Sequence, residues 1–478
     1  MKIGIIQNAP RTADLSNNLR HIVQGYRTCQ DHGAELVVAS AHALCGPGLH
    51  DLVSRDSFQE QMQRALQTLS RELGDAPLIL GAYSTAPDMD DEEEGGAFTT
   101  QLTPYLLEND MVEELENGEV VEWEGKELCI TTDDIPLQPG LDAHDIIIHV
   151  GSAPWHTALL REEAQRRQNE AINNDATVVY AACVGTAEEQ IFGGGSGIYN
   201  PQGKNLLRLP WFDTESRVAS IVPPYREADT QPETEAGTLA RMLQQGIRDT
   251  VRQYGYGGAC ISLDAPCSTL LAALAIDALG SANVEGVTFG DAEAMAKTLG
   301  ISCKKMDDRA ILQSAKAELG EEEAEALQAR LRAAMLSTHS ESRGLLLLCP
   351  LSRRDIMLGH YTLYGESCGM LAPLGHLYEM DLHMLQQEYK ERHSDLFGTL
   401  AEPQAPEKDI IIHALADCNV SAGRFIRENN FGLEENAIRQ VQRRLISSAL
   451  KRSQLPFTLQ VSAPEEQLRI PSAHRLND

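Results

Sequence analysis

Two short stretches of the sequence carry residue types that could take part in chemistry. The first is LDAPCSTLLAALAIDALG at 263–280, a loop that follows an apolar run and leads into a helical pattern. Such a loop commonly binds phosphate, because its backbone N–H groups and the helix N-terminus attract anions. Glycines normally allow that approach, yet this loop carries Asp264 and Pro266. Pro266 has no N–H to donate and Asp264 adds negative charge, so the loop does not favour a polyphosphate with its Mg²⁺.

Cys267 is the last residue of this loop before the helical pattern. A helix dipole at that position could lower the pKa of the thiol and make it reactive. A buried cysteine that only fills space is the alternative, and it is the interpretation we favour. The thiol alone therefore does not define a reaction.

The second stretch is SAHALCGPGLHD at 40–51, which holds four residues of metal-ligand type: His42, Cys45, His50 and Asp51. Their spacing matches no established zinc motif. His42 and His50 are weak metal candidates, and ordinary packing is the favoured alternative. We expect no metal site here.

Apolar runs alternate with amphipathic helical patterns along the first half of the chain. The runs predicted to be buried strands are KIGIIQ (2–7), ELVVAS (35–40), PLILGAY (77–83), DIIIHV (145–150) and TVVYAA (177–182). Helical patterns cover 17–31 and 158–173, and YNPQGK at 199–204 is typical of a hairpin turn. The alternation of strand and helix predicts an α/β fold.

A domain boundary is predicted at VPPYREADTQPETEAG (222–237), because this stretch is rich in proline, acidic and aperiodic. Beyond it, GACISL, VEGVTFG and RGLLLLCP are predicted to be buried parallel strands with helices between them, as in a doubly wound sheet. The predicted organisation is a first domain at 1–226, a linker at 227–236 and a second domain at 237–478.

The composition narrows the class of protein. The 478 residues carry a formal net charge of −30, which disfavours nucleic-acid binding because phosphate contacts need clustered Lys and Arg. The ten cysteines form no C-x-x-C pair, and no run of about 18 apolar residues is long enough for a membrane span. We expect a cytoplasmic protein that binds neither nucleic acid nor membrane.

Six segments in order are similar to those of the glutamine-dependent NAD+ synthetases. They are MKIGIIQNAPRTADLSNNL, GAELVVASAHALCGPGLHDL, GGACISLDAPCSTLLAALAIDALGSANVEGVT, LQARLR, GHYTLYGESCGMLAPLG and KRSQLP. The resemblance covers nearly the whole chain. It implies a nitrilase-like αββα sandwich, the amidase domain, followed by a doubly wound parallel-sheet domain of the adenine nucleotide alpha hydrolase type, the synthetase domain.

The resemblance also implies where an amidase site would lie. In that family a Glu base, a Lys and a Cys nucleophile release ammonia from glutamine. The matching positions here are Ala41, Thr99 and Thr132, and a shift of one residue would place Asp133 at the nucleophile position. None of these side chains is a thiol, so the resemblance implies a vestigial amidase site.

The ATP loop of the family, S-G-G-x-D-S, falls on Leu263, Asp264, Ala265, Pro266, Cys267 and Ser268, and only Ser268 is kept. A second family segment falls on 350–355, where Asp355 is a weak metal candidate. Retained residues that could still contact ATP or a nicotinate nucleotide are Gln328, Arg330, Arg353, Lys451 and Gln454. Their alternative role is to maintain the fold and the dimer contact that the family uses.

These substitutions lead to two expectations about function. The first is a catalytically degenerate paralogue, a pseudoenzyme that acts by assembly, regulation or nucleotide sensing. The alternative is an enzyme with residual ammonia-dependent NAD+ synthetase activity, or with a different amide-forming ligase reaction. In both cases the resemblance implies a homo-oligomer, at least a dimer through the synthetase-like domain, and the first adds a functional NAD+ synthetase or another protein as partner.

Overall fold

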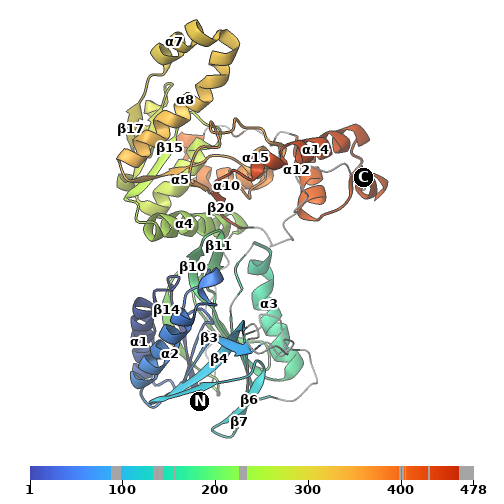
Figure 1. Cartoon of the computed structure of the whole chain (residues 1–478). Coiled ribbons are helices and arrows are strands. Elements are labelled where there is room, and N and C mark those ends of the chain that lie inside the picture. The colour runs from blue at the N-terminus through green and yellow to red at the C-terminus, as the bar shows by residue number, and fades with distance from the viewer. Residues whose placement is uncertain are drawn as a thin grey trace. The chain divides into compact units, whose positions relative to one another are not determined.

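The computed structural model describes residues 1–87, 98–132, 137, 144–151, 153–155, 157–224, 234–397, 400, 403, 405–428 and 431–461. The chain divides into two compact units, Met1–Pro232 and Glu233–Asp478, which we call unit 1 and unit 2 (Figure 1). Residues 227–233 of the predicted linker lie outside the described residues. The first helix of unit 2 begins at Glu235, where the Thr234 side chain caps it by accepting from the Gly237 N–H.

Two six-stranded sheets form the centre of unit 1, in the orders β14-β1-β2-β3-β4-β5 and β13-β12-β9-β8-β7-β6, beside a two-stranded hairpin, β10-β11. The strands are β1 (Lys2–Gln7), β2 (Leu36–Ala39), β3 (Leu78–Pro87), β4 (Phe98–Glu108), β5 (Met111–Glu114), β6 (Glu119–Trp123), β7 (Lys126–Thr131), β8 (Ile146–Val150), β9 (Thr177–Ala181), β10 (Val184–Ala187), β11 (Gln190–Gly193), β12 (Gly197–Tyr199), β13 (Asn205–Arg208) and β14 (Glu215–Ser220). All five predicted strands are present, and 199–204 joins antiparallel β12 and β13 as predicted.

Helices cover the outer faces of these sheets. α1 (Leu15–Asp31) and α2 (Asp56–Arg71) pack on one sheet through a core that includes Ile22, Met62 and Val37. α3 (Thr157–Asn174) packs on the other, and a short 3₁₀ turn spans His50–Leu52. Between the sheets lies a separate apolar layer with Ile5 and Ile148. The predicted αββα sandwich is therefore confirmed (Figure 1).

Unit 2 is built on one parallel sheet in the order β17-β16-β15-β18-β19-β20. Its strands are β15 (Gly258–Ser262), β16 (Val284–Thr288), β17 (Ser302–Lys305), β18 (Leu345–Leu348), β19 (Leu371–Ala372) and β20 (Phe457–Thr458). The strand order reverses between β15 and β18. In open α/β sheets such a reversal leaves a crevice at the carboxyl ends of the strands. The doubly wound fold that the sequence predicts is confirmed.

The helices of unit 2 are α4 (Glu235–Gln253), α5 (Ser268–Leu279), α6 (Glu293–Leu299), α7 (Arg309–Leu319), α8 (Glu321–Ser342), α9 (Arg353–Leu358), α10 (Glu379–Arg392), α11 (Ser394–Phe397), α12 (Pro406–Ile412), α13 (Ala422–Glu428), α14 (Glu435–Ser447) and α15 (Ala449–Arg452), with a 3₁₀ turn at Ser281–Asn283 and a π-helical turn at His413–Asp417. α8 packs on the sheet through Leu336, which contacts the layer of Cys260 and Leu347. Among the described residues, no helix is long and apolar enough to span a membrane.

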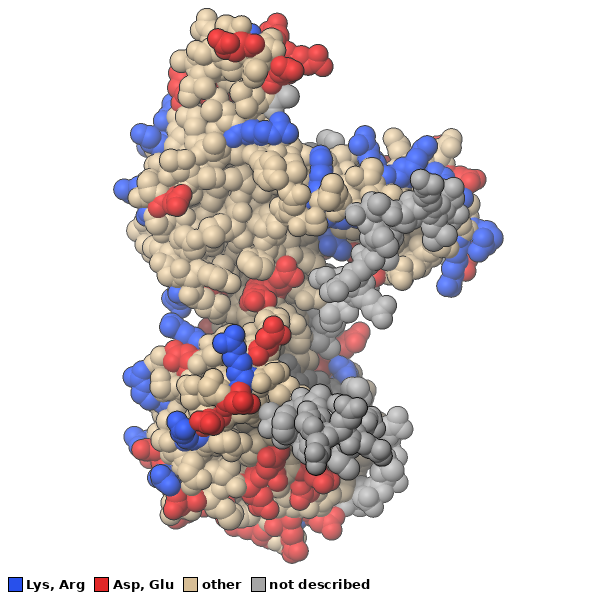
Figure 2. All heavy atoms as spheres, viewed as in Figure 1, with Lys and Arg blue, Asp and Glu red and all other residues tan. Residues whose placement is uncertain are grey.

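Charged side chains of both signs are spread over the face that Figure 2 draws. Acidic side chains gather near the end of the β6–β7 hairpin, where Glu122, Glu124 and Glu127 are exposed. Unit 1 therefore carries part of the strongly negative net charge on one end of its second sheet.

Candidate functional site

A cavity of about 510 Å³ lies in unit 2 at the carboxyl ends of β15 and β18. This is the crevice that the reversal of strand order predicts. Its polar lining is Ser262, Asp264, Gln328, Arg332, Asp355, His360, Thr362 and Glu366. Apolar side chains such as Leu347 and Leu348 line the rest. A mostly apolar pocket with a few convergent polar groups is typical of a small-molecule site.

The loop 263–268 lies at this cavity and keeps the strand–loop–helix form. The Asp264 carboxylate accepts hydrogen bonds from the Thr288 hydroxyl at 2.7 Å and from the Phe289 N–H at 2.6 Å. The Ser268 hydroxyl donates to the Leu263 carbonyl oxygen at 3.0 Å and closes the turn before α5. Asp264 therefore has a structural role that the sequence did not predict, because it joins the end of β15 to the end of β16.

Cys267 occupies the N-cap position of α5 in a left-handed conformation, with φ of 58°. Burial raises the pKa of its thiol to about 11, and the charges of Glu379 and Asp355 act in the same direction. The interpretation in which the helix dipole lowers this pKa and makes the thiol reactive is therefore wrong. The favoured alternative, a largely enclosed cysteine that fills space, agrees with this environment.

Arg332 of α8 supplies positive charge to the cavity. Its Nε donates to the buried Asp308 carboxylate at 2.6 Å, and the Gln328 amide donates to the same oxygen at 3.2 Å. The guanidinium also lies over the Phe289 ring, 5.1 Å from its centroid. Asp308 and Phe289 thus fix the direction of Arg332 before any ligand is bound. The sequence pattern LQARLR pointed to Gln328 and Arg330, but Arg330 is exposed on α8 and does not line the cavity.

Asp355 lines the cavity, but its carboxylate also caps a helix. One oxygen accepts from the Ser352 N–H at 3.1 Å and from the Ser352 hydroxyl at 2.7 Å, which completes a capping box at the start of α9. Arg353 instead pairs with Asp417, which also accepts a hydrogen bond from the Tyr378 hydroxyl. Arg353 is therefore engaged within the protein rather than in the lining of the cavity.

Two other predicted nucleotide contacts also bond within the protein. The Lys451 ammonium donates to the carbonyl oxygens of Gly359 at 3.2 Å and Tyr361 at 2.9 Å. Gln454 accepts from the Tyr364 hydroxyl at 2.6 Å. Neither residue is part of the cavity lining. These contacts are consistent with the alternative role, in which Lys451 and Gln454 help to maintain the fold.

The positions predicted for an amidase site lie in unit 1. Ala41 is fully buried, and its N–H donates to the Gly151 carbonyl oxygen at 3.2 Å. Thr132 is also buried, and its hydroxyl lies 3.3 Å from both the Leu102 carbonyl oxygen and the Asn117 amide oxygen. Neither a carbonyl oxygen nor an amide oxygen is a base strong enough to remove the proton of a hydroxyl. Thr99 pairs with Ala86 in the β3–β4 ladder, and Asp133 lies outside the described residues.

The four residues of metal-ligand type at 42–51 differ strongly in environment. His42 packs against the rings of Tyr83 and Phe192. Burial raises the pKa of Cys45 to about 12, which disfavours the thiolate that a metal needs. His50 is exposed and pairs with Glu188 at 2.9 Å. In the part of the chain that the structure describes, no group of three His, Cys, Asp or Glu side chains could hold a metal ion.

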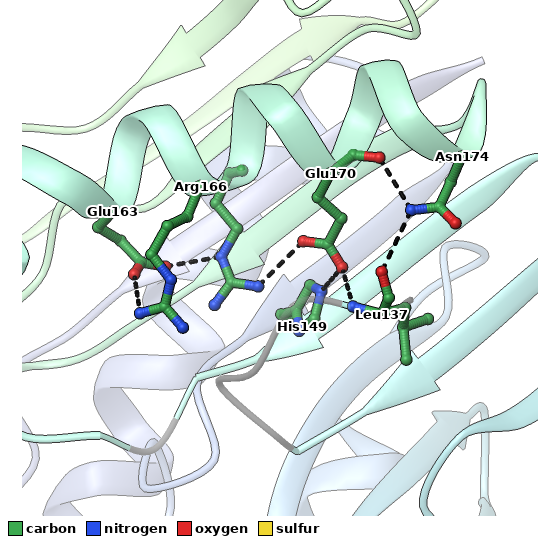
Figure 3. Close-up of polar contacts among 7 residues, drawn as sticks. Leu137, His149, Glu163, Arg166, Glu170 and Asn174 are labelled. Atoms are coloured by element: carbon green, nitrogen blue, oxygen red, sulfur yellow. Dashed lines mark hydrogen bonds and ion pairs between the residues drawn. The ribbon is translucent and has the colours of Figure 1, made fainter. Parts of the chain in front are cut away.

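A buried ionic network in unit 1 joins α3 to β8 (Figure 3). His149 Nε2 lies 2.8 Å from one Glu170 oxygen, and Arg167 donates to the other at 3.1 Å. Arg167 also donates to Glu163 at 2.6 Å, and the Leu137 N–H donates to Glu170 at 2.7 Å. The side chains of His149 and Glu170 are completely buried. Sequence reasoning missed this network, although the helical spacing of three and four residues between its charges was a usable signal.

Comparisons with known proteins agree with this architecture. The family model described as NAD synthase matches residues 239–392. The chain is 26% identical to the glutamine-dependent NAD(+) synthetase of Thermotoga maritima over 466 residues, which covers 81% of each protein. It is 30% identical to the NH(3)-dependent NAD(+) synthetase of Methanosarcina mazei over 151 residues, 28% of this chain and 59% of that protein.

A solved structure supports the fold of both units together. The crystal structure of a glutamine-dependent NAD(+) synthetase from Cytophaga hutchinsonii superposes with a TM-score of 0.82 at 14% identity, covering 99% of this chain and 98% of that chain. In sequence and in fold, the chain is similar to the glutamine-dependent NAD+ synthetases. The resemblance inferred from the six segments is thereby confirmed.

One expectation from the sequence is contradicted. We expected a pseudoenzyme, but the NAD+ synthetases that this chain matches over most of their length are enzymes. The reason for the error is that loop substitutions were taken as loss of the whole site. The structure has a cavity at the strand reversal and an oriented Arg332 despite those substitutions.

Proposed function

We propose that unit 2 is an amide-forming ligase of the NAD+ synthetase type that takes free ammonia as its nitrogen donor. The observation that carries this proposal is the cavity at the reversal of strand order, where Arg332 and Gln328 are held by the buried Asp308. Both side chains can bind a negatively charged nucleotide substrate, since guanidinium and amide groups donate hydrogen bonds to anionic oxygens. The family relationship supports the same reaction class.

The choice of ammonia over glutamine rests on unit 1. Release of ammonia from glutamine requires a nucleophile and a base within reach of one another. At the positions that the family resemblance assigns to the nucleophile and the base, this chain has Thr132 and Ala41. The alanine side chain has no group that can accept a proton. A ligase without its own source of ammonia would use ammonia from solution.

A direct assay tests the proposal. The purified chain is incubated with deamido-NAD+, ATP and Mg²⁺, and with either ammonium or glutamine, and NAD+ is measured. We expect NAD+ with ammonium and none with glutamine. Formation of NAD+ from glutamine alone would contradict the ammonia proposal, and absence of NAD+ in both arms would contradict the assignment of deamido-NAD+ as the acid.

The role of Arg332 has a matched control. Arg332→Met should lower kcat/KM for the nucleotide substrate by about tenfold or more, which corresponds to roughly 1.4 kcal/mol of transition-state stabilisation. Arg332→Lys should recover part of it, because the charge is kept. Arg309→Met is the control, since Arg309 is exposed, pairs with Asp307 and does not line the cavity. Equal activity of Arg332→Met and Arg309→Met would exclude Arg332 from the site.

A second candidate is the same ligase chemistry on a different carboxylic acid. The loop with Asp264 and Pro266 favours it, because this loop departs from the family pattern at four of the five positions that the pattern specifies and so presents a different surface to the substrate. Release of AMP or ADP from ATP in the presence of ammonium and a panel of carboxylic acids, without NAD+ formation, would support this candidate.

A further inference from the structure

A Cys–His–Asp chain lies on unit 2 outside the cavity. α12 continues into the π-helical turn His413–Asp417, in which the Cys418 N–H donates to the His413 carbonyl oxygen at 2.8 Å. In a regular α-helix, side chains five positions apart point about 140° away from each other. The wider turn brings these two together, and the Cys418 Sγ lies 3.4 Å from the His413 Nε2. Such π-helical turns occur frequently at functional sites.

The second nitrogen of His413 fixes the orientation of the ring. His413 Nδ1 lies 3.4 Å from Asp417 Oδ2. The ring also meets the Tyr378 ring at 89°, with centroids 6.3 Å apart. When Nδ1–H donates to the carboxylate, the lone pair of Nε2 is directed at the thiol of Cys418. Nucleophile, base and orienting carboxylate therefore follow one another within hydrogen-bond reach.

Asp417 is held in its ionised form. Burial alone would raise the pKa of this carboxyl, but the hydrogen bond from His413, the charge of Arg353 and the Tyr378 hydroxyl together lower it to about 2. A permanent negative charge beside His413 stabilises the imidazolium that forms when the ring takes a proton from the thiol. The carboxylate thus supports proton transfer as well as orientation.

Exposure distinguishes Cys418 from the other cysteines. All ten cysteines lie in the described part of the chain, and Cys418 is the exposed one among them. The side chain of His413 is 54% exposed, so a solute can reach the pair. By contrast, burial raises the pKa of Cys29, Cys260 and Cys349 to about 12. Exchange with a solute therefore favours Cys418 over these thiols.

We propose that Cys418 is a reactive thiol that exchanges with low-molecular-weight disulfides. His413 takes the thiol proton, and the Cys418 thiolate attacks one sulfur of the disulfide. The sulfur–sulfur bond of that disulfide breaks as the bond to Cys418 forms, and the other half leaves as a thiolate that receives the proton. Cys418 is oxidised to a mixed disulfide, and the leaving half is reduced to a thiol. The reverse exchange with a free thiol restores Cys418.

The test uses the full chain and oxidised glutathione. Intact mass and peptide mapping should show one adduct, on Cys418. At pH 7 the rate constant for His413→Gln should be about three- to tenfold lower than for the unaltered chain, because less thiolate is present, and this loss outweighs the higher nucleophilicity of a more basic thiol. The pH profile separates the two proteins. The rate for the unaltered chain should reach its plateau at a lower pH, whereas the rate for His413→Gln should still rise up to about pH 8.5.

Two cysteine variants complete the design. Cys418→Ser should abolish the adduct, while Cys303→Ser, at another cysteine that is only partly buried, should leave it unchanged. His413 is exposed, so His413→Gln should fold normally, and circular dichroism verifies this. An adduct that forms first on Cys303, or a His413→Gln protein with the rate and pH profile of the unaltered chain, would overturn the proposal.

Discussion

Asp264 is the residue at which the loop of unit 2 departs most clearly from a phosphate cradle. Its carboxylate lines the cavity while it accepts from Thr288 and Phe289. A glycine at this position would leave the Phe289 N–H without this acceptor. The carboxylate therefore contributes to the connection between β15 and β16, and it places a negative charge where an anionic ligand would approach.

Substitution of Asp264 tests how much that charge matters for ligand binding. Asp264→Asn removes the charge and keeps an oxygen that can accept from Thr288 or Phe289. We expect MgATP to bind about three- to tenfold more tightly, because one repulsive interaction is removed, and we expect the gain to shrink at high salt. Isothermal titration calorimetry at two ionic strengths measures both effects.

The control for this substitution is Asp291→Asn. Asp291 is exposed, pairs with Lys305 and does not line the cavity, so its removal should leave ATP binding unchanged. Weaker binding by Asp264→Asn would contradict the repulsion argument and would show instead that the hydrogen bonds to β16 shape the site.

Elements with a strong local pattern were predictable from the sequence. KIGIIQ is β1, and the helical pattern at 17–31 lies within α1, because a regular apolar period indicates the type of an element and its approximate extent. The cavity was not predicted, since its lining comes from segments far apart in the sequence, among them β15, α8 and 360–368, which only the tertiary fold brings together. The turn at His413–Asp417 was missed for a related reason: one extra residue per turn leaves no periodic signal in five positions.

The buried ionic network between α3 and β8 should contribute to the stability of unit 1. Glu170→Gln removes the carboxylate that faces both His149 and Arg167. Removing one partner of a buried ion pair typically lowers the stability of a protein by several kcal/mol. The free energy of unfolding of unit 1 should therefore fall by about 3 kcal/mol. Glu60→Gln, which breaks an exposed pair with Arg64, should have no measurable effect in urea denaturation. Equal effects would show that the network does not stabilise unit 1.

The same carboxylate gives a pH dependence with a definite sign. Burial would raise the pKa of Glu170, but the hydrogen bond and charge of His149 and the charge of Arg167 lower it below the ordinary value of 4.5. Its stabilising contribution is therefore complete above about pH 4.5 and is lost as the pH falls below that value. The free energy of unfolding should decrease on acidification below pH 4.5, and less steeply in Glu170→Gln. Parallel curves for the two proteins would contradict this assignment.

At the scale of the whole molecule, each unit has its own apolar core. In unit 1 one core lies between the sheets and another lies under α1 and α2, while unit 2 has cores around α8 and around α9 and α14. The predicted homo-oligomer and protein partner stay predictions, and light scattering on the purified chain would measure the oligomer. Because the cores are separate, we expect a substitution in the core of one unit to change the stability of that unit alone.

Calorimetric unfolding should accordingly show two transitions rather than one. Glu170→Gln should lower only the transition of unit 1, and Leu347→Ala, which removes a side chain from a core of unit 2, should lower only the other. Deamido-NAD+ with MgATP, at about 100 times the dissociation constant, should stabilise the second transition by about 2.7 kcal/mol, because a ligand that binds the native state alone shifts unfolding by mass action. Glutamine should shift neither. A single transition lowered by both substitutions would show that the two units unfold as one, and a shift of the unit 1 transition by glutamine would indicate a glutamine site in unit 1.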